Sequence, residues 1–126
     1  MLVDDLEANR FLLEEALDDL GVEILTADGG RRALQVAAAS HPEVVVLDFQ
    51  MPDLNGAETA RALKQTAGPF TYVILTSGYR EAADGEAIDT SSVDRFLGKP
   101  YALGDLRASV IEGLRVSRER RAAVTS

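Results

Sequence analysis

Short apolar runs alternate along this chain with longer stretches in which apolar residues recur every three or four positions. The short runs are rich in Val, Ile and Leu, which is typical of strands, and the longer stretches have the period of amphipathic helices. Strands are expected at residues 1–3, 22–27, 44–47, 72–75 and 93–97. Helices are expected at residues 7–20, 31–40, 57–65, 80–92 and 103–120. This alternation predicts βαβ units around a parallel sheet.

The run at 44–47 is apolar at every position rather than at alternate positions. A strand shows this pattern when helices cover both of its faces, as in the centre of a doubly wound sheet. The first run, by contrast, has only three residues, although the first strand of such a sheet normally lies in its middle and is well buried. We therefore expect the numbered start of the chain to fall inside the first strand.

The helices differ in how clearly the sequence defines them. The first is expected to end at Gly21 and to bury one apolar face, formed by Phe11, Leu12, Ala16, Leu17 and Leu20. The last is expected to bury a face formed by Leu106, Val110, Ile111 and Leu114. The helix at 80–92 is the weakest, because glycine, aspartate, serine and threonine residues of low helix propensity fill it. We expect it to be short or mobile.

Size and charge narrow the class of protein. The 126 residues, 46% of them hydrophobic and 27% charged, fit one domain, which we place at residues 1–121 with a C-terminal tail at 122–126. The net charge of −8 argues against direct binding to nucleic acid or to an anionic membrane. The lack of cysteine, signal peptide and long apolar segment predicts a cytoplasmic protein. Cations are favoured near a helix C-terminus, so four arginines there are expected to be solvated: Arg115, Arg118, Arg120 and Arg121.

Polar residues stand where several of the predicted strands end. They are Asp4 and Asp5 after the first strand, Asp48 after the third, Thr76 and Ser77 after the fourth, and Lys99 after the fifth. Because ligands in parallel sheets bind outside the carboxyl ends of the strands, these side chains are expected to converge at one edge. Taken singly, each has an ordinary explanation as a helix cap or a turn residue, and their coincidence is what indicates a site.

The chemistry of this set favours the handling of a phosphoryl group. Three converging carboxylates would repel one another unless a cation neutralised them, and a hard divalent ion such as Mg²⁺ suits an all-oxygen site. This ion usually retains several waters, which leave room for phosphoryl oxygens. Lys99 supplies a compact positive charge, Ser77 supplies a hydroxyl, and Gly78 lets the backbone approach closely.

These residues resemble the motifs of the response-regulator receiver domain of two-component signalling. The resemblance rests on Asp4-Asp5, the run Val-Val-Val-Leu-Asp48 with Met51-Pro52 and Gly56 after it, Thr76-Ser77-Gly78, and Lys99-Pro100. It covers nearly the whole chain. It implies an α/β fold with a flavodoxin-like, doubly wound, five-stranded parallel sheet in the strand order 2-1-3-4-5, together with five helices.

The resemblance also implies a role for each site residue. Asp48 would be the phosphoacceptor and Mg²⁺ the cofactor. The ion would be bound directly by Asp5, Asp48 and the backbone carbonyl of Gln50, and through a water by Asp4. Lys99 would bind a phosphoryl oxygen, and the peptide bond between Lys99 and the proline after it is expected to be cis.

Two further residues match the positions that change conformation in this family. Ser77 or Thr76 would be the switch hydroxyl, and we favour Ser77 because it lies at the strand exit and precedes the small residue Gly78. Phe96 matches the aromatic switch position of the fifth strand. Ordinary core packing is an equally good explanation of Phe96, since aromatic side chains commonly bury in sheets.

The function that the resemblance implies is that of a phosphoacceptor in a two-component phosphorelay, not of a dedicated enzyme. A histidine kinase or a histidine phosphotransfer protein would donate the phosphoryl group. Phosphorylation would switch a surface formed by the helix at 80–92, the strand at 93–97 and the last helix, and a downstream protein would bind there. Homodimerisation is compatible with this scheme.

Three other functions compete with this one. A phosphorylation-independent, receiver-like interaction module is the main alternative, but such a module need not retain Asp5, Asp48, Ser77 and Lys99 together. A phosphatase of the haloacid dehalogenase type has a second aspartate two residues after its nucleophile, where this chain has Gln50. A flavodoxin-like nucleotide binder would need hydroxyls and free amides in the first loop, where this chain has two aspartates.

Overall fold

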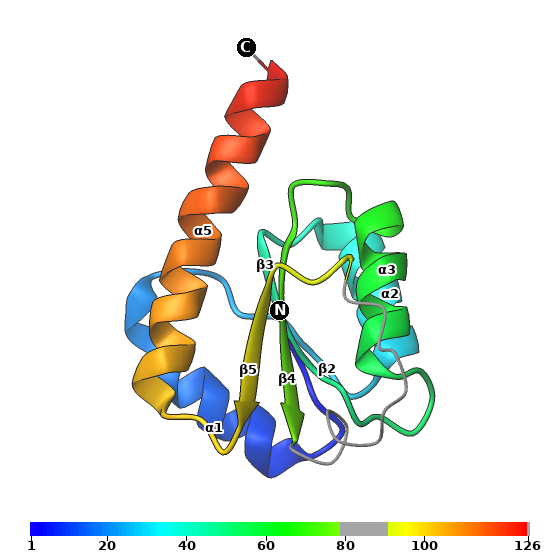
Figure 1. The fold of residues 1–126 in the computed structure, drawn as a ribbon, viewed down its shortest axis with the longest axis vertical. Coiled ribbons are helices and arrows are strands. Elements are labelled where there is room, and N and C mark those ends of the chain that lie inside the picture. The colour runs from blue at the N-terminus through cyan, green and yellow to red at the C-terminus, as the bar shows by residue number, and fades with distance from the viewer. Residues whose placement is uncertain (79–90, 126) are drawn as a thin grey trace.

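Five parallel strands form one sheet in the order β2-β1-β3-β4-β5, with helices on both faces (Figure 1). The computed structural model describes residues 1–78 and 91–125. The strands are β1 (Leu2–Val3), β2 (Thr26–Ala27), β3 (Val44–Asp48), β4 (Tyr72–Gly78) and β5 (Arg95–Lys99). The helices are α1 (Glu7–Leu17), α2 (Gly30–Ser40), α3 (Gly56–Thr66) and α5 (Leu103–Thr125), and a short 3₁₀ helix follows α1 at Asp18–Leu20. The predicted doubly wound α/β fold and its strand order are confirmed.

The sheet separates two apolar layers. Helices α1 and α5 cover one face, and α2 and α3 cover the other (Figure 1). Within β3, Val44 and Val46 belong to the layer of α1 and α5, whereas Val45 and Leu47 belong to the layer of α2 and α3. All residues of β3 are buried because helices cover both of its faces. The consecutive apolar positions of this run therefore predicted a central strand correctly.

Strands β1 and β2 each contain only two residues. β2 contains only Thr26–Ala27, instead of the expected residues 22–27, and it pairs with Leu2 and Val3 of β1. A strand exists where its backbone is hydrogen-bonded to a neighbour, and β1 offers β2 a partner only from Leu2 onwards. The expected start of β2 was wrong because pairing, and not the apolar pattern, sets the strand boundary.

The buried face of α1 differs from the predicted one. Leu13 and Leu17 are its buried residues, whereas Phe11 and Leu12 are 62% and 50% exposed. Three consecutive apolar residues at 11–13 fit more than one helical face. The helix is rotated so that Leu13 and Leu17, one turn apart, contact the sheet. The prediction that Phe11 and Leu12 are buried was therefore wrong.

Helix α5 packs closely against the sheet. Leu106 and Val110 are buried as predicted, but Ile111 is 48% exposed. The contact face uses small residues instead, since a Cβ atom on Gly113 would lie 2.6 Å from the ring of Tyr72. Small residues carry little apolar signal, so the pattern did not reveal them. The helix also continues beyond its expected end near residue 120 and projects past the sheet (Figure 1).

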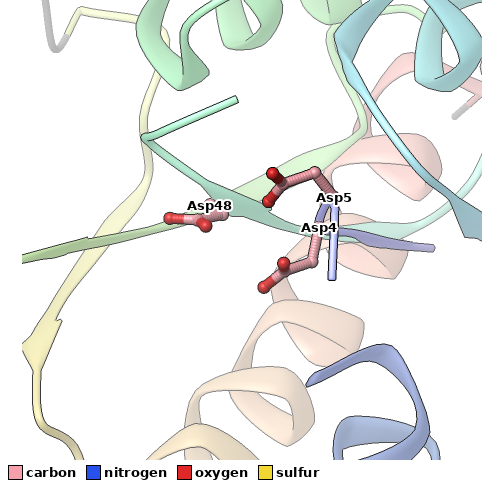
Figure 2. Close-up of side chains that lie close together, drawn as sticks. All are labelled: Asp4, Asp5 and Asp48. Carbon is pink, nitrogen blue, oxygen red and sulfur yellow. The ribbon is translucent and has the colours of Figure 1, made fainter. Parts of the chain in front are cut away.

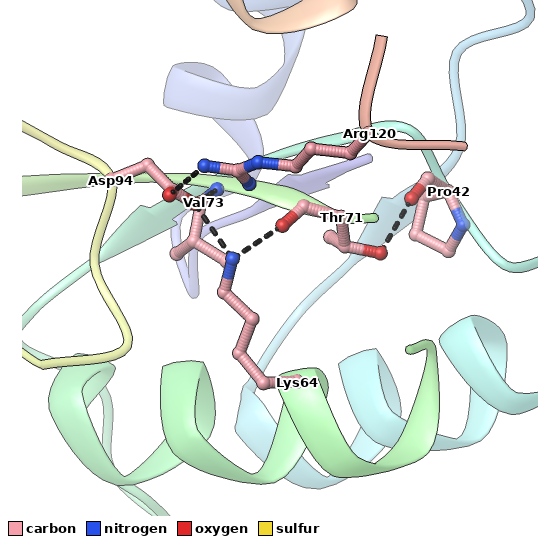
Figure 3. A network of polar contacts seen from close by, with 6 residues as sticks. All are labelled: Pro42, Lys64, Thr71, Val73, Asp94 and Arg120. Carbon is pink, nitrogen blue, oxygen red and sulfur yellow. Dashed lines mark hydrogen bonds and ion pairs between the residues drawn. The ribbon is translucent and has the colours of Figure 1, made fainter. Parts of the chain in front are cut away.

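A charged network ties α3 and α5 to the amino-terminal edge of the sheet (Figure 3). Its centre is the carboxylate of Asp94, which accepts hydrogen bonds from Lys64 Nζ at 2.7 Å, Arg120 Nη2 at 2.7 Å and the Val73 amide at 2.8 Å. The expectation that Arg120 is solvated is therefore wrong. Helix α5 carries Arg120 past the start of β5, where Asp94 binds it.

The weak helix expected at 80–92 falls almost entirely outside the described residues. Its last two residues, Ser91 and Ser92, form a turn. The described part of the chain therefore has four α-helices where five were expected. None of these four is both long and apolar enough to cross a lipid bilayer.

Candidate functional site

Three aspartates come together where β1 and β3 end (Figure 2). The register pairs Val3 with Leu47, so Asp4 and Asp48 leave adjacent strands side by side. One carboxylate oxygen from each of Asp4, Asp5 and Asp48 lies within 4.8 Å of the others. The structure thus brings together the acidic residues that the sequence placed at one edge of the sheet.

Asp48 is the buried centre of this cluster. It is the last residue of β3, and its Oδ1 accepts a hydrogen bond from Lys99 Nζ at 2.9 Å and a longer one from the Gln50 amide at 3.3 Å. The amide contact orients the carboxylate from the backbone of the following loop, and the ammonium contact balances part of its charge. The Asp48 carboxylate is therefore held by two different parts of the fold.

Asp4 and Asp5 have different surroundings although they are adjacent. Asp4 is buried, and its oxygens accept hydrogen bonds from the Leu6 amide at 2.9 Å and from Asn9 Nδ2 at 3.3 Å. Burial raises the pKa of Asp4, and the charge of Asp48 adds to the rise, against the opposing effect of those two hydrogen bonds. Asp5 is exposed, so its carboxylate is accessible to a ligand that arrives from solvent.

Lys99 is the cation that contacts this cluster. It ends β5, and its side chain passes the end of β4 to reach Asp48 on β3. Burial disfavours its ammonium form, but the hydrogen bond to Asp48 and the charges of Asp48 and Asp4 raise the pKa of Lys99 above its usual value. Its peptide bond to Pro100 is cis, as predicted. Among the described residues, the cluster therefore contains three carboxylates but only one ion-paired cation, Lys99.

Two buried hydroxyls lie on β4 next to the cluster. The register pairs Thr76 with Asp48, so these side chains leave the same face of the sheet, and the Thr76 hydroxyl donates to the Leu47 carbonyl at 3.2 Å. Ser77 follows on the opposite face by strand alternation, and its hydroxyl donates to the Gly78 carbonyl at 3.3 Å. The register, which the sequence does not reveal, therefore places Thr76 beside Asp48.

Phe96 lies on β5 close to this edge of the sheet. The register pairs it with Leu75 of β4, and its side chain is 43% exposed. A residue that served ordinary core packing would be buried, as the next residue Leu97 is. Core packing therefore does not account for Phe96.

The loop between β3 and α3 contains an aspartate that the sequence analysis did not single out. Asp53 accepts hydrogen bonds from the Arg31 amide at 2.9 Å and the Gly30 amide at 3.0 Å, at the start of α2. Amide hydrogen bonds, that of Arg31 first, lower the pKa of Asp53. They anchor the loop that contains Gln50 to a second helix. An aspartate after a proline has the local appearance of a turn residue, so no signal in the sequence pointed to this role.

Gly56 allows α3 to begin directly beneath the site. A Cβ atom at this position would lie 2.8 Å from the Phe49 Cα atom and 2.9 Å from the Asp48 carbonyl oxygen. The Gly56 amide donates a hydrogen bond to the Phe49 carbonyl at 2.9 Å. Close approach of the backbone to the end of β3 therefore requires glycine here.

The chain is similar to known signalling proteins. Residues 1–111 match the response regulator receiver domain family. The chain is 35% identical over 126 residues to the KDP operon transcriptional regulatory protein KdpE of Escherichia coli (strain K12), a match that covers 100% of this chain and 53% of that protein. It is 34% identical over 107 residues to the autoinducer 1 sensor kinase/phosphatase LuxN of Vibrio campbellii, which covers 85% of this chain and 12% of that protein.

The fold comparison agrees with the sequence comparison. The crystal structure of a CheY-like response regulator receiver domain protein from Methanospirillum hungatei JF-1 matches with a TM-score of 0.80 and 26% identity, over 94% of this chain and 95% of that one. The chain spans about half of KdpE and a smaller part of LuxN. The chain belongs to the response regulator receiver domain family.

Proposed function

We propose that this domain takes a phosphoryl group onto Asp48 from the phosphohistidine of a histidine kinase or a histidine phosphotransfer protein. The observation that carries the proposal is the position of Asp48, buried at the end of a central strand among two further aspartates and Lys99. If the ion pair between Lys99 and Asp48 were purely structural, it would not need two further aspartates beside it. The surplus supports a role in binding a cation and a phosphoryl group.

The proposed step exchanges one bond to phosphorus for another. A carboxylate oxygen of Asp48 attacks the phosphorus while the bond to the donor imidazole nitrogen breaks and the imidazole keeps its electron pair, which leaves an aspartyl phosphate. Lys99 donates a hydrogen bond to a phosphoryl oxygen and stabilises the charge on it in the transition state. The Gln50 amide keeps the attacking carboxylate oriented.

The acidic cluster suits Mg²⁺, which we propose as the cofactor. Hard divalent cations prefer oxygen ligands, and three carboxylates here offer oxygens within 4.8 Å of one another. Asp5, Asp48 and the Gln50 backbone carbonyl would hold the ion directly. Both oxygens of Asp4 already accept hydrogen bonds, which supports a contact through water instead. When bound, the ion would neutralise charge on the phosphoryl oxygens.

We also propose that phosphorylation draws in one of the two hydroxyls of β4, that of Ser77 or that of Thr76, and lets Phe96 move inward. The hydrogen bond from the Ser77 hydroxyl to the Gly78 carbonyl is long, at 3.3 Å, and Phe96 is 43% exposed, which supports movement of both side chains. The register favours Thr76, which lies beside Asp48, whereas Ser77, the choice from the sequence, leaves the opposite face of the sheet. The variants Ser77→Ala and Thr76→Val distinguish the two. The variant at the switch position still accepts the phosphoryl group but loses the shift of the Phe96 NMR signals that beryllofluoride, a phosphoryl mimic, causes in the parent.

The output of the domain is proposed by class of partner. A downstream protein would bind the surface formed by residues 80–92, β5 and α5. KdpE is a transcriptional regulatory protein and LuxN a sensor kinase/phosphatase, so the same kind of domain occurs in relatives of different organisation. The domain would assist its own phosphorylation and dephosphorylation without being a dedicated enzyme.

Intact mass tests the proposal. The protein is incubated with Mg²⁺ and acetyl phosphate, next to an Asp48→Asn control and a parent sample with excess chelator. We expect one phosphoryl adduct in the parent with Mg²⁺ and none in the other two samples. If the parent forms no adduct and beryllofluoride with Mg²⁺ leaves its amide NMR spectrum unchanged, the phosphoacceptor role is wrong and a phosphorylation-independent interaction module takes its place.

A further inference from the structure

Two separate loops carry the oxygens that we propose as ligands of Mg²⁺. The loop after β1 carries Asp4 and Asp5 (Figure 2), and the loop after β3 carries Gln50, whose ligand would be its backbone carbonyl. A backbone carbonyl cannot turn independently of its loop, so its distance from the Asp5 carboxylate depends on how the two loops are held. Mg²⁺ requires near-ideal octahedral geometry with short ligand distances, so an error in this spacing weakens binding.

The loop after β3 is fixed at both ends by backbone hydrogen bonds. At its start, the Phe49 amide donates to the Thr76 carbonyl at 2.9 Å, and at its end the Gly56 amide donates to the Phe49 carbonyl at 2.9 Å. Asp53 lies between these ends, three residues after Gln50. The contacts of Asp53 therefore bear on the middle of the loop, near the proposed ligand.

Asp53 provides the cap that helix α2 does not contain itself. The N-cap residue of α2 is Gly29, which has no side chain to accept hydrogen bonds from the amides of the first turn. The Asp53 carboxylate accepts them instead, from the Gly30 amide at 3.0 Å and from the Arg31 amide at 2.9 Å. The helix dipole also favours a carboxylate at this end. Asp53 is exposed, but two backbone amides hold its carboxylate in place.

Close packing holds the loop against the start of α2 as well. A Cβ atom on Gly29 would lie 3.1 Å from Asp53 Oδ1. A Cβ atom on Gly30 would lie 2.8 Å from Leu54 Cβ and 2.5 Å from Thr59 Oγ1. Both the shape of this junction and its hydrogen bonds therefore set the position of Asp53.

The start of α2 is also attached to the loop that carries Asp4 and Asp5. The Asp4 amide donates a hydrogen bond to the Ala27 carbonyl at 3.2 Å. Ala27 ends β2, and α2 begins at Gly30. The short connection from β2 to α2 is thus bound by the Asp4 backbone at one end and by Asp53 at the other. It bridges the two loops that carry the proposed ligands.

We propose that Asp53 is a positioning residue for the Mg²⁺ site, which sets the distance between the Gln50 carbonyl and the Asp5 carboxylate by holding the loop after β3 on the start of α2. This role rests on the proposed function, because it concerns the cation site proposed there. Asp53 acts through the backbone of its loop and not by contact with the ion. The same link keeps the Gln50 amide directed at Asp48 Oδ1, to which it donates at 3.3 Å.

Mg²⁺ titrations followed by amide NMR shifts test this role in the parent, Asp53→Ala and Asn55→Ala. Asn55 is the matched control, because it lies in the same loop but its side chain caps α3, where it accepts from the Glu58 amide at 2.8 Å. We expect Asp53→Ala to weaken Mg²⁺ binding about threefold to tenfold, less than the roughly 10–100-fold cost of losing a direct hydrogen-bond partner of a metal ligand. Asp53→Asn keeps one acceptor oxygen and should show a smaller loss.

Urea unfolding of the same variants separates positioning from stability. Asn55→Ala loses a helix cap and should be destabilised, yet its Mg²⁺ affinity should stay close to that of the parent. Equal Mg²⁺ affinity in the parent and Asp53→Ala would overturn the proposal. An equal loss of affinity in Asp53→Ala and Asn55→Ala would also overturn it, because the effect would then belong to the stability of the loop and not to its link with α2.

A variant on the other side of the contact tests the link without removing the charge. Gly29 is extended, with φ of −174°, so its backbone accepts alanine, but the methyl group would lie closer to Asp53 Oδ1 than Cβ atoms usually approach. Gly29→Ala should therefore displace the carboxylate and weaken Mg²⁺ binding in the parent. In the Asp53→Ala background it should have no further effect, since the carboxylate is gone. Additive effects of the two substitutions would contradict the proposed link.

Phosphorylation by acetyl phosphate distinguishes a failure of this role from a failure of the proposed function. Asp48 and Lys99 remain paired in Asp53→Ala, so its rate of adduct formation should fall at low Mg²⁺ and approach the parent rate at saturating Mg²⁺. A lower rate at saturating Mg²⁺ with unchanged affinity would overturn the role of Asp53 alone. A parent that neither binds Mg²⁺ nor forms an adduct would overturn the proposed function together with this role.

Discussion

At the carboxyl edge of the sheet, Asp48 and two further aspartates share the one ion-paired Lys99, whereas at the amino edge Asp94 alone is bound by both Lys64 and Arg120 (Figures 2 and 3). Burial works against the charged carboxylate at both places. At the amino edge, hydrogen bonds from two cations and an amide more than offset burial and lower the pKa of Asp94. At the carboxyl edge, burial and the neighbouring charge of Asp48 prevail and raise the pKa of Asp4.

We call the Asp94 network closed, because two cations bind its single carboxylate, and the Asp48 cluster open, because its three carboxylates share one ion-paired lysine. In the network around Asp94, two cations and a backbone amide bind one carboxylate, and these bonds hold α3 and α5 on the sheet. Among the described residues, the three carboxylates around Asp48 share the single ion pair with Lys99, and such excess negative charge costs stability and is retained at sites that bind a further charged group. A carboxylate at one edge should therefore stabilise the fold, and a carboxylate at the other should weaken it.

The largest expected effect is on the closed network. Asp94→Ala should lower the free energy of unfolding by about 2–3 kcal/mol, because it leaves two partly buried cations and the Val73 amide without their acceptor. Urea unfolding measures the loss. Asp19→Ala, which removes an exposed ion pair with Arg107, is the control and should change stability far less. Similar losses in the two variants would show that the Asp94 network is not special.

A smaller effect is expected from Mg²⁺ at the open cluster. At a free concentration ten times its dissociation constant, the ion should stabilise the folded domain by about 1.4 kcal/mol. Thermal unfolding with and without the ion measures this gain. Asp5→Asn should abolish it because one proposed ligand is lost, whereas Asp94→Asn should keep it although that variant is less stable. An equal response to Mg²⁺ in parent and Asp5→Asn would exclude the acidic cluster as the binding site.

A gain in stability is expected when the open cluster loses a charge. Asp4→Asn should raise the free energy of unfolding by about 0.5–1 kcal/mol at pH 7, since it removes a buried charge that Asp48 repels. The amide oxygen still accepts from the Leu6 amide, and the weaker contact with Asn9 at 3.3 Å is the one put at risk. Urea unfolding at pH 7 checks the sign. A destabilised Asp4→Asn variant would mean that Asp4 holds the fold together as Asp94 does.

The smallest expected effect is the change of that gain with pH. The pKa of Asp4 is raised by folding, so above this pKa the folded parent carries the full cost of the charge, and below the unfolded value of about 4 it carries none. The stability difference between Asp4→Asn and the parent should therefore shrink as the pH falls from 7 to 4. Unfolding curves at several pH values measure this change. A difference that grows toward acid would reverse the assigned shift of Asp4.

The sequence predicted those parts of the fold and site that depend on order along the chain. The fully apolar run before Asp48 indicated a central strand, and in a parallel sheet every strand end lies at the same edge. That rule alone placed Asp4, Asp48 and Lys99 together before any contact was known. The fold class and the convergence of the charged site residues therefore followed from local patterns and one topological rule.

The features that the sequence did not predict depend on contacts between distant segments. Whether Thr76 or Ser77 faces Asp48 is set by the register of β3 and β4, which no local pattern encodes. Arg120 binds Asp94, which lies 26 residues away in the sequence, and Asp53 binds the start of α2, which lies more than 20 residues away. Each of these residues has an ordinary local explanation as a helix or turn residue, so its tertiary role was not visible.

The central claim is that the excess negative charge of the open cluster serves phosphoryl transfer to Asp48. The most direct test is to find which residue carries the phosphoryl group. The protein is incubated with Mg²⁺ and acetyl phosphate and then treated with borohydride, which reduces an acyl phosphate to an alcohol. Peptide mass spectrometry then locates the residue that has changed. The account predicts homoserine at position 48 and at no other aspartate. Homoserine at position 94 or 53 instead, or reduction at several aspartates alike, would contradict it.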